Sequence, residues 1–261
     1  MDSNTYKRND FIRTAYISSL AVMSFLKKAI TFNKPLNQDK DALEGLKNNG
    51  FVIIKNIFSD SEIQALYEST LSFLDNENTK NYNGDFRRFN ANQSNDINSV
   101  YSKNSFITDL MTGYLGYKPK FDSTLAANLK FTENNLGSGQ GWHRDSYSRQ
   151  VKSIIYLTKV TNNNGPFEYL KGSHSFKNIL RDSIFLNKIS DGGYNQVRYS
   201  PEEIDYLIEE YNYEKIIMPG DIGDLIIADT RGLHRGHPIK EGHRVALTNY
   251  FQDLSLRSFF S

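Results

Sequence analysis

The chain has 261 residues, of which 38% are hydrophobic and 23% charged, a composition typical of a folded globular protein. Its 31 Lys and Arg nearly balance its 30 Asp and Glu. The net charge of +1 argues against nucleic acid as the main partner, because backbone binding needs a clustered excess of cations. The absence of cysteine excludes disulfides, thiolate metal sites and cysteine nucleophiles, and it fits a cytoplasmic location.

The N-terminal part of the chain contains one apolar run, "AYISSLAVMSFL" at 15–26. The run is too short to span a bilayer, and it lacks the small-residue cleavage site of a signal peptide. We therefore expect no membrane partner. We expect residues 1–45 to form a helical extension that packs on a single domain of residues 46–261.

The next elements are a strand and a helix. "GFVIIKNIF" at 50–58 is rich in β-branched residues behind a glycine, which predicts a buried strand. Ser59 and Glu62 have the spacing of a capping box, so a helix is expected to begin there. The polar, Asn-rich stretch 76–104 predicts a long loop, and "SFITDLMTGYLGY" at 105–117 predicts a short helix.

From about residue 121 the pattern changes to short apolar runs bounded by Gly, Asn, Asp and Pro, which predict strands. The runs are "TLAANLKF", "KSIIYLT", "PFEYL", "YEKIIM", "DLIIAD" and "RVALTNYF". A helical insert at about 174–211 interrupts them, with a second capping box at Ser200 and Glu203 around Pro201. The order predicts a mainly β fold, a sandwich or open barrel buttressed by helices.

One short stretch, "GWHRDSYSR" at 141–149, raises the possibility of a metal site. His143 and Asp145 are two residues apart, so on extended backbone both side chains project from the same face. Taken alone, such a triplet is a weak signal, and a surface turn is the simpler interpretation.

A third candidate ligand strengthens the metal interpretation. His234 follows the predicted strand "DLIIAD" and a turn, so it is expected at a strand edge. Two His and one carboxylate, without thiolates, match the facial triad of non-haem Fe(II) oxygenases, which leaves three coordination positions open. His237 is the alternative third ligand. We interpret His174 as a structural turn residue and His243 as exposed.

Arg244 begins the strand "RVALTNYF", ten residues after His234. Alternation places Arg244, Ala246, Thr248 and Tyr250 on one face of this strand, with Val245, Leu247 and Phe251 on the other. An arginine on the small-residue face needs an anion, and the far carboxylate of 2-oxoglutarate would supply one. The charges of Fe(II), Asp145, 2-oxoglutarate and Arg244 sum to zero, which favours burial of the cluster. The alternative is a solvated surface arginine.

Four of these stretches together resemble the phytanoyl-CoA dioxygenase family, a branch of the Fe(II)/2-oxoglutarate-dependent oxygenases. They are "GFVIIKNIFSDSEIQAL", "WHRD", "VTNNNGPFEYLKGSH" and "LHRGHPIKEGHRVALTNYF", in the expected order over about 45–255. The resemblance implies a double-stranded β-helix, a jelly-roll barrel like that of cupins. It also implies that His143, Asp145 and His234 bind iron and that Arg244 anchors 2-oxoglutarate.

The resemblance further implies the reaction. Such enzymes use O2 and decarboxylate 2-oxoglutarate to succinate and CO2 while they oxidise a substrate, here expected to be a small-molecule metabolite. Asp145 fills the position where related halogenases carry a small residue, so hydroxylation of an unactivated C–H bond is favoured. Many relatives carry a serine where this chain has Gly236, and a tryptophan in the strand that here contains Ile154 and Tyr156.

Several further residues are candidates for the pocket. Lys130 lies on the strand before the triplet and shares a face with Asn128, so we expect a supporting contact to 2-oxoglutarate. Arg87 and Arg88, followed by Phe89, could contact an anionic substrate or remain solvated. Arg231 could face the pocket mouth or brace Asp229.

Two rival functions stay open at this stage. The first is a cupin-like metalloprotein with a non-oxidative activity, which would have no need of Arg244. The second is a catalytically silent binding module. The sequence gives no indication of the oligomeric state.

Overall fold

The computed structural model describes residues 39–147, 149–186 and 197–252, together with four single positions at 15, 18, 19 and 22. Those four positions are helical, but the packing predicted for 15–26 lies outside the described residues. The division of the chain at residue 46 stays a prediction. None of the described helices is long and apolar enough to cross a membrane.

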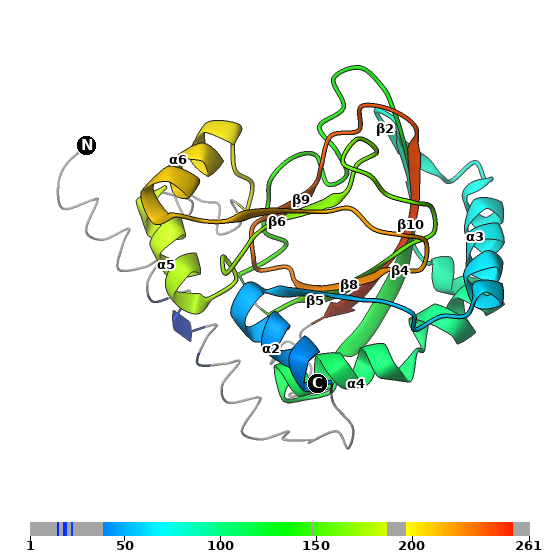
Figure 1. Ribbon diagram of the computed structural model, residues 1–261, viewed down its shortest axis with the longest axis horizontal. Coiled ribbons are helices and arrows are strands. Elements are labelled where there is room, and N and C mark those ends of the chain that lie inside the picture. The colour runs from blue at the N-terminus through cyan, green and yellow to red at the C-terminus, as the bar shows by residue number, and fades with distance from the viewer. Residues whose placement is uncertain are drawn as a thin grey trace.

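The larger of two antiparallel sheets has seven strands in the order β1-β8-β5-β10-β4-β3-β2. The strands of this sheet are short β-branched or aromatic runs or polar segments at the sheet edge, and each pairs with its neighbour (Figure 1). The strands are β1 (Phe51–Ile54), β2 (Lys80–Tyr82), β3 (Asp85–Arg88), β4 (Lys120–Lys130), β5 (Val151–Tyr156), β8 (Leu225–Asp229) and β10 (His243–Gln252).

The smaller sheet has three strands in the order β7-β6-β9, which are β7 (Lys215–Met218), β6 (Phe167–Leu170) and β9 (His234–Gly236). Figure 1 shows β6 and β9 lying across from β5 and β8. Apolar side chains fill the space between the two sheets, among them Ile154, Tyr169, Ile226 and Ala246. Two facing antiparallel sheets with flanking helices confirm the predicted mainly β fold of the double-stranded β-helix type.

Helices cover the outer face of the large sheet. They are α2 (Lys40–Asn49), α3 (Asp60–Leu74), a π-helical turn η2 (Ile97–Ser102) and α4 (Ser105–Leu115), and they form the main apolar core against the sheet (Figure 1). The capping box of Ser59 and Glu62 begins α3 as predicted. The predicted insert contains α5 (Phe176–Phe185) and α6 (Pro201–Tyr211), and the capping box at Ser200 begins α6.

The prediction of a long loop over 76–104 is wrong in part. This stretch contains β2, β3, a short 3-10 turn η1 (Ala91–Gln93) and η2. Its polar composition hid the strands, because β3 is held by backbone pairing with β4, Arg87 lying opposite Ala127. This polar segment therefore forms one edge of the large sheet instead of a free loop.

β10 lies in the middle of the large sheet, between β5 and β4. Val245 and Leu247 pack into the helix-covered core, whereas Ala246 belongs to the cluster between the sheets. The alternation predicted from the sequence is therefore confirmed, and it directs Arg244 and Thr248 toward the space between the sheets.

Candidate metal centre

Two chain segments far apart in sequence bring His143 and His234 directly opposite each other. The backbone N–H of His143 donates to the carbonyl of His234 at 2.9 Å, and that of His234 donates back at 3.0 Å. Paired residues of an antiparallel bridge project to the same side, and the two imidazole centroids lie 4.4 Å apart. The N–H of Asp145 donates to Thr230 at 2.9 Å, which fixes the third side chain beside them.

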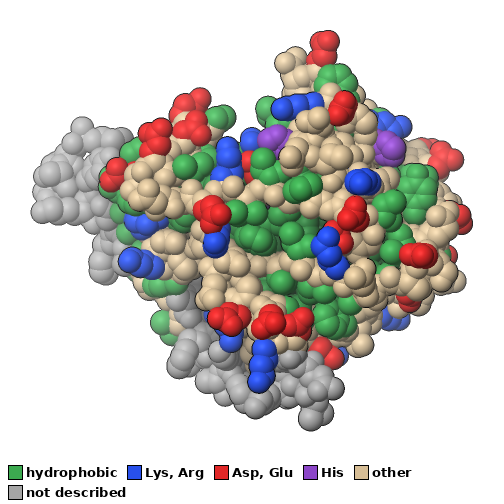
Figure 2. Space-filling view, in the orientation of Figure 1, with side chains coloured by type: hydrophobic (Ala, Val, Ile, Leu, Met, Phe, Trp, Pro, Cys, Tyr) green, Lys and Arg blue, Asp and Glu red, His purple; other side chains and the backbone are tan. Residues whose placement is uncertain are grey.

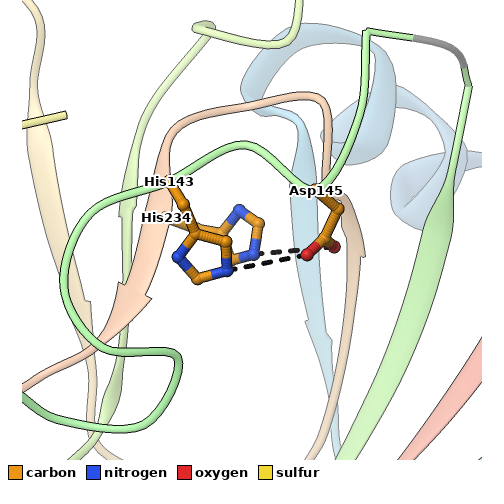
Figure 3. Close-up of side chains that lie close together, drawn as sticks. All are labelled: His143, Asp145 and His234. Carbon is orange, nitrogen blue, oxygen red and sulfur yellow. Dashed lines mark ion pairs between the residues drawn. The ribbon is translucent and has the colours of Figure 1, made fainter. Parts of the chain in front are cut away.

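The three side chains point toward a common centre (Figure 3). His143 Nε2 lies 3.6 Å from Asp145 Oδ1, and His234 Nε2 lies 3.7 Å from Asp145 Oδ2. One ligand atom from each residue falls within 4.8 Å of the other two. His237 is not part of this group, because its Nδ1 lies 3.1 Å from Oε2 of the buried Glu168.

Backbone carbonyls orient both imidazole rings. His143 Nδ1 lies 2.9 Å from the Gly141 carbonyl, and His234 Nδ1 lies 2.9 Å from the Gly232 carbonyl. A carbonyl can only accept, so each Nδ1 carries the proton and each Nε2 presents a lone pair to the centre. Gly139 permits this packing, since a Cβ there would lie 2.5 Å from His143 Cε1.

The protonation states suit a cation. Burial, together with the neighbouring His143, lowers the pKa of His234 to about 3, so this imidazole is neutral at pH 7. Burial alone would raise the pKa of Asp145, but the Lys152 ammonium holds it well below its ordinary value. Lys152 Nζ lies 2.6 Å from Asp145 Oδ2, and its side chain is 9% exposed. The carboxylate is therefore ionised and ready to bind a metal.

Arg144, between the two ligands of the triplet, is fully buried. Its guanidinium donates to Asp182 Oδ2 on α5 at 2.8 Å, to the Ser173 carbonyl at 2.7 Å and to the Arg231 carbonyl. Arg231 lies three residues before His234, so Arg144 ties together the two segments that carry the candidate ligands.

A cavity of about 450 Å³ opens onto the three ligands. Arg244 lines this cavity and is 6% exposed. Its guanidinium donates to the Gly165 carbonyl, but its buried Nε has no partner, and no carboxylate among the described residues pairs with it. Burial lowers the pKa of Arg244, the direction expected for a buried cation without an acid partner.

Lys130 does not reach the cavity, so its predicted contact to 2-oxoglutarate has no support in the structure. Leu125 and Ala127 line the cavity, and alternation along β4 turns Lys130 to the opposite face. There it is exposed, with Nζ 5.2 Å from the Phe86 ring centroid. The sequence showed which residues share a face with Lys130, but it did not show which face is covered.

Of the other residues considered in the sequence analysis, some line the cavity and others have a structural role. Arg87 lines the cavity, whereas Arg88 packs over Phe73 and donates to its carbonyl at 2.9 Å. Arg231 braces Asp229 at 2.6 Å, the structural alternative. His174 Nε2 lies 3.1 Å from the Lys47 carbonyl at the end of α2, as expected of a structural residue.

Gly236 stands where many relatives were expected to have serine. A Cβ at this position would lie 2.7 Å from the Cβ of Ser138, whose own side chain lines the cavity. The close approach of the 138 segment therefore requires glycine at 236, and a hydroxyl still reaches the cavity from Ser138.

Two cavity residues, Lys152 and Arg198, were missed by the sequence analysis. Lysine inside the apolar strand "VKSIIY" was an available signal, because an unpaired ammonium does not persist in a buried strand. Arg198 gave no signal, since its place depends on pairing with His143. Lys152 adds a positive charge, so the prediction of a neutral inner cluster is wrong.

A family model of phytanoyl-CoA dioxygenase matches residues 46–245, more than half of the chain. The chain belongs to the phytanoyl-CoA dioxygenase family. The resemblance recognised in the sequence is thereby confirmed, and the protein is an oxygenase that uses iron and 2-oxoglutarate. No curated protein sequence matches the chain.

Solved structures of other oxygenases share the fold of this family member. The epimerase SnoN, in complex with Fe3+, alpha ketoglutarate and nogalamycin RO, is 14% identical with a TM-score of 0.64, covering 82% of this chain and 83% of SnoN. The carbocyclase SnoK is 17% identical with a TM-score of 0.62, covering 85% and 86% of the two chains. EctD from S. alaskensis is 14% identical with a TM-score of 0.61, covering 86% and 78%.

The residues of this phytanoyl-CoA dioxygenase family member fit both cofactors. Two imidazoles and a carboxylate are the donor set that suits non-haem iron. The unpartnered, buried guanidinium of Arg244 suits the far carboxylate of 2-oxoglutarate, because a planar guanidinium can bind a carboxylate with two parallel hydrogen bonds.

Proposed function

We propose that the protein hydroxylates an unactivated C–H bond of a small-molecule metabolite and converts 2-oxoglutarate to succinate and CO2. In this proposal His143, Asp145 and His234 hold the iron, and Arg244 binds the far carboxylate of 2-oxoglutarate. The observation that carries the proposal is the buried Arg244, which lines the same cavity as the three ligands and has no acid partner among the described residues. A metalloprotein without a keto-acid co-substrate would have no use for that cation.

Each residue has a defined task in this scheme. The two imidazoles and the ionised carboxylate bind the iron on one side, which leaves the cavity side for co-substrate and O2. The iron supplies the oxidising chemistry when it is bound. Asp145 occupies the position that a halide would need, which favours hydroxylation over halogenation. Arg144 fixes the two segments that carry the ligands relative to each other through its hydrogen bonds to the Arg231 carbonyl and Asp182.

The cavity and the comparisons support a small-molecule substrate. A volume of about 450 Å³ suits a metabolite beside 2-oxoglutarate. The solved relatives were crystallised with nogalamycin RO and with 5-hydroxyectoine, which are small molecules. The near-balanced net charge of +1 and the absence of a membrane-spanning helix among the described residues point the same way.

The proposal is tested by mixing the protein with Fe(II) and 2-oxoglutarate without oxygen. The expected result is the weak visible charge-transfer band of an iron–keto-acid chelate, lost in His234→Ala and retained in His237→Ala, the matched control. Metal binding without the band would favour the non-oxidative metalloprotein. Absence of Fe(II) and Mn(II) binding in calorimetry would favour the silent binding module.

A further inference from the structure

The cavity carries more positive charge than iron and 2-oxoglutarate need. Five cationic residues of the described chain line it, but only one acid does: they are Arg87, Arg144, Lys152, Arg198 and Arg244, against Asp145. Asp182 pairs with Arg144 and Asp85 with Arg87.

In the loaded protein the two negative charges of 2-oxoglutarate balance the two positive charges of the iron. The cations without a partner outside the cavity are Lys152, Arg198 and Arg244, and Asp145 balances one of these three charges. Two positive charges are left around the loaded pocket, on the buried Arg244 and the exposed Arg198, and an excess of this kind favours an anionic ligand.

Arg198 reaches the cavity because its backbone pairs with the metal-ligand segment. It lies opposite His143 in an antiparallel bridge, so the two side chains project to the same side. Its Nη1 donates to the carbonyls of Gly139 at 2.8 Å and Gln140 at 3.0 Å. The residue is exposed, which places its guanidinium at the mouth of the cavity.

Arg87 lines the same cavity from a different element, the strand β3. Its side chain is 19% exposed, it pairs with the buried Asp85, and its buried Nε has no partner. Burial lowers the pKa of Arg87, and repulsion from Arg244 and Arg198 lowers it further. Arg87, Arg198 and Arg244 thus all line one cavity, and Asp145 is the one acid among the described residues that lines it.

We propose that Arg87 and Arg198 form a binding site for an anionic group of the substrate, a carboxylate or a phosphate, at the mouth of the cavity. The proposal rests on the proposed function and adds to it the substrate class. Figure 2 shows the surface notched between the side of α5 and α6 and the side of β2, with basic side chains along the notch.

The rest of the cavity lining specifies the other end of the substrate. Leu125, Ile154, Phe167 and Ala246 give the same cavity an apolar part of its lining. An anionic end held by the two arginines would direct an aliphatic part toward the iron ligands. The substrate class is therefore a small acid or phosphate ester with an apolar chain, oxidised at a distance from its anionic group.

The test uses protein loaded with Mn(II) and 2-oxoglutarate, which binds substrates without turnover. Calorimetry compares hexanoate, hexyl phosphate and the neutral hexanamide as probes. The wild-type protein is expected to bind one of the anions at least about tenfold more tightly than the amide, as for a charge-assisted contact. The tighter of the two anions identifies the group as carboxylate or phosphate.

Variants separate the site from the general charge of the protein. Arg198→Gln is expected to reduce the preference for the anion by about tenfold, because it removes the positive charge of this exposed residue and keeps a side-chain donor for the Gly139 and Gln140 carbonyls. Arg88→Gln, one residue from Arg87 but packed over Phe73 outside the cavity, is the matched control and should leave the preference unchanged.

Arg87→Gln alone would leave Asp85 buried without its cation, so the double variant Asp85→Asn/Arg87→Gln replaces it. The double variant should lose the preference, and Asp85→Asn alone should keep or increase it, because Arg87 is then free to bind the probe.

Four results would overturn the proposal, three of them measured with the probes. They are equal binding of hexanamide and the anions, no detectable binding of either anion, or equal losses in Arg88→Gln and Arg198→Gln. A loss of 2-oxoglutarate affinity instead of probe affinity would assign these arginines to the co-substrate, which also overturns it. Failure of the proposed function shows separately, as a missing iron–keto-acid band in the wild-type protein.

Discussion

The buried arginines of this fold form two regions that differ in their counter-charges. In the first, close to the candidate metal centre, Arg144 pairs with Asp182 at 2.8 Å and Arg231 pairs with Asp229 at 2.6 Å. In the second, on β10, Arg244 is buried in the cavity and none of the described acids pairs with it.

This difference distinguishes buried arginines that stabilise the fold from a buried arginine that binds a ligand. A buried cation that is paired within the protein stabilises the fold, and its removal leaves an uncompensated partner. A buried cation that is left unpaired destabilises the empty protein and is compensated only when a ligand binds. Substitutions in the two regions should therefore have opposite effects.

The largest effect is expected from Asp182→Ala in the paired region. This change leaves the fully buried Arg144 without its carboxylate and removes the acceptor of Tyr213 Oη, 2.9 Å away. We expect a loss of about 3–5 kcal/mol in the free energy of unfolding, measured by urea denaturation. Lys171→Ala breaks the exposed pair with Glu214 and should cost less than about 1 kcal/mol. Equal losses would remove the distinction.

Lys152 shares features of both regions, because it is paired with Asp145 and also lines the cavity. In Lys152→Met, the stability of the fold should depend more strongly on bound metal than in the wild-type protein. Without the ammonium, the ionised Asp145 stays buried and unpaired, so the metal-free protein should lose about 3 kcal/mol. Mn(II) should restore most of this loss, since the ion replaces the missing positive charge.

The measurement for Lys152→Met is the rise in Tm on addition of Mn(II), which should be larger than in the wild-type protein. Lys55→Met removes a lysine that is 60% exposed beside Asp224 and serves as the control. A rise that is equal or smaller in Lys152→Met would contradict the linkage.

The paired region should also carry a distinct sensitivity to acid. Burial opposes ionisation of Asp229, but Arg231 and Tyr114 outweigh it and lower its pKa from 3.8 to about 2. The ionised form therefore stabilises the fold above about pH 4, and this contribution is lost as the pH falls toward 2.

At about 1.4 kcal/mol for each unit of pKa, Asp229→Asn should lose about 2 kcal/mol at pH 7. Its stability should also decline less than that of the wild-type protein below pH 4. Urea denaturation between pH 7 and pH 2.5 measures both effects, and parallel curves for the two proteins would refute the assignment.

The smallest effect on stability, and the one of opposite sign, is expected from Arg244→Met. Removal of a buried, uncompensated cation should raise the free energy of unfolding of the ligand-free protein by about 1 kcal/mol. Excess 2-oxoglutarate should stabilise the wild-type protein and not this variant. A loss of stability comparable to that of Asp182→Ala would show that Arg244 is a structural residue.

The parts of the site that local spacing and alternation determine could be predicted from the sequence. The two-residue spacing of His143 and Asp145 and the alternation along β10 are properties of the backbone, and both hold in the structure. The strands from 121 onward were predictable for the same reason, since their apolar runs end at turn residues.

The parts that depend on tertiary pairing could not be predicted. Lys130 was assigned to the wrong side because alternation gives two faces without naming the covered one. β3 was taken for loop because its stability comes from β4. The contacts of Arg198 and Arg144 join segments that are distant in sequence and that only the fold brings together, so no local pattern predicts them.

The most direct test of the unpaired cation compares two keto acids that differ only in the far carboxylate. 2-Oxoglutarate and 2-oxopentanoate are titrated calorimetrically into the Mn(II)-loaded wild-type protein and Arg244→Gln. The wild-type protein should prefer 2-oxoglutarate by about 10- to 100-fold, and Arg244→Gln should bind both keto acids equally weakly. A preference that persists in Arg244→Gln would contradict the assignment of Arg244 to the co-substrate.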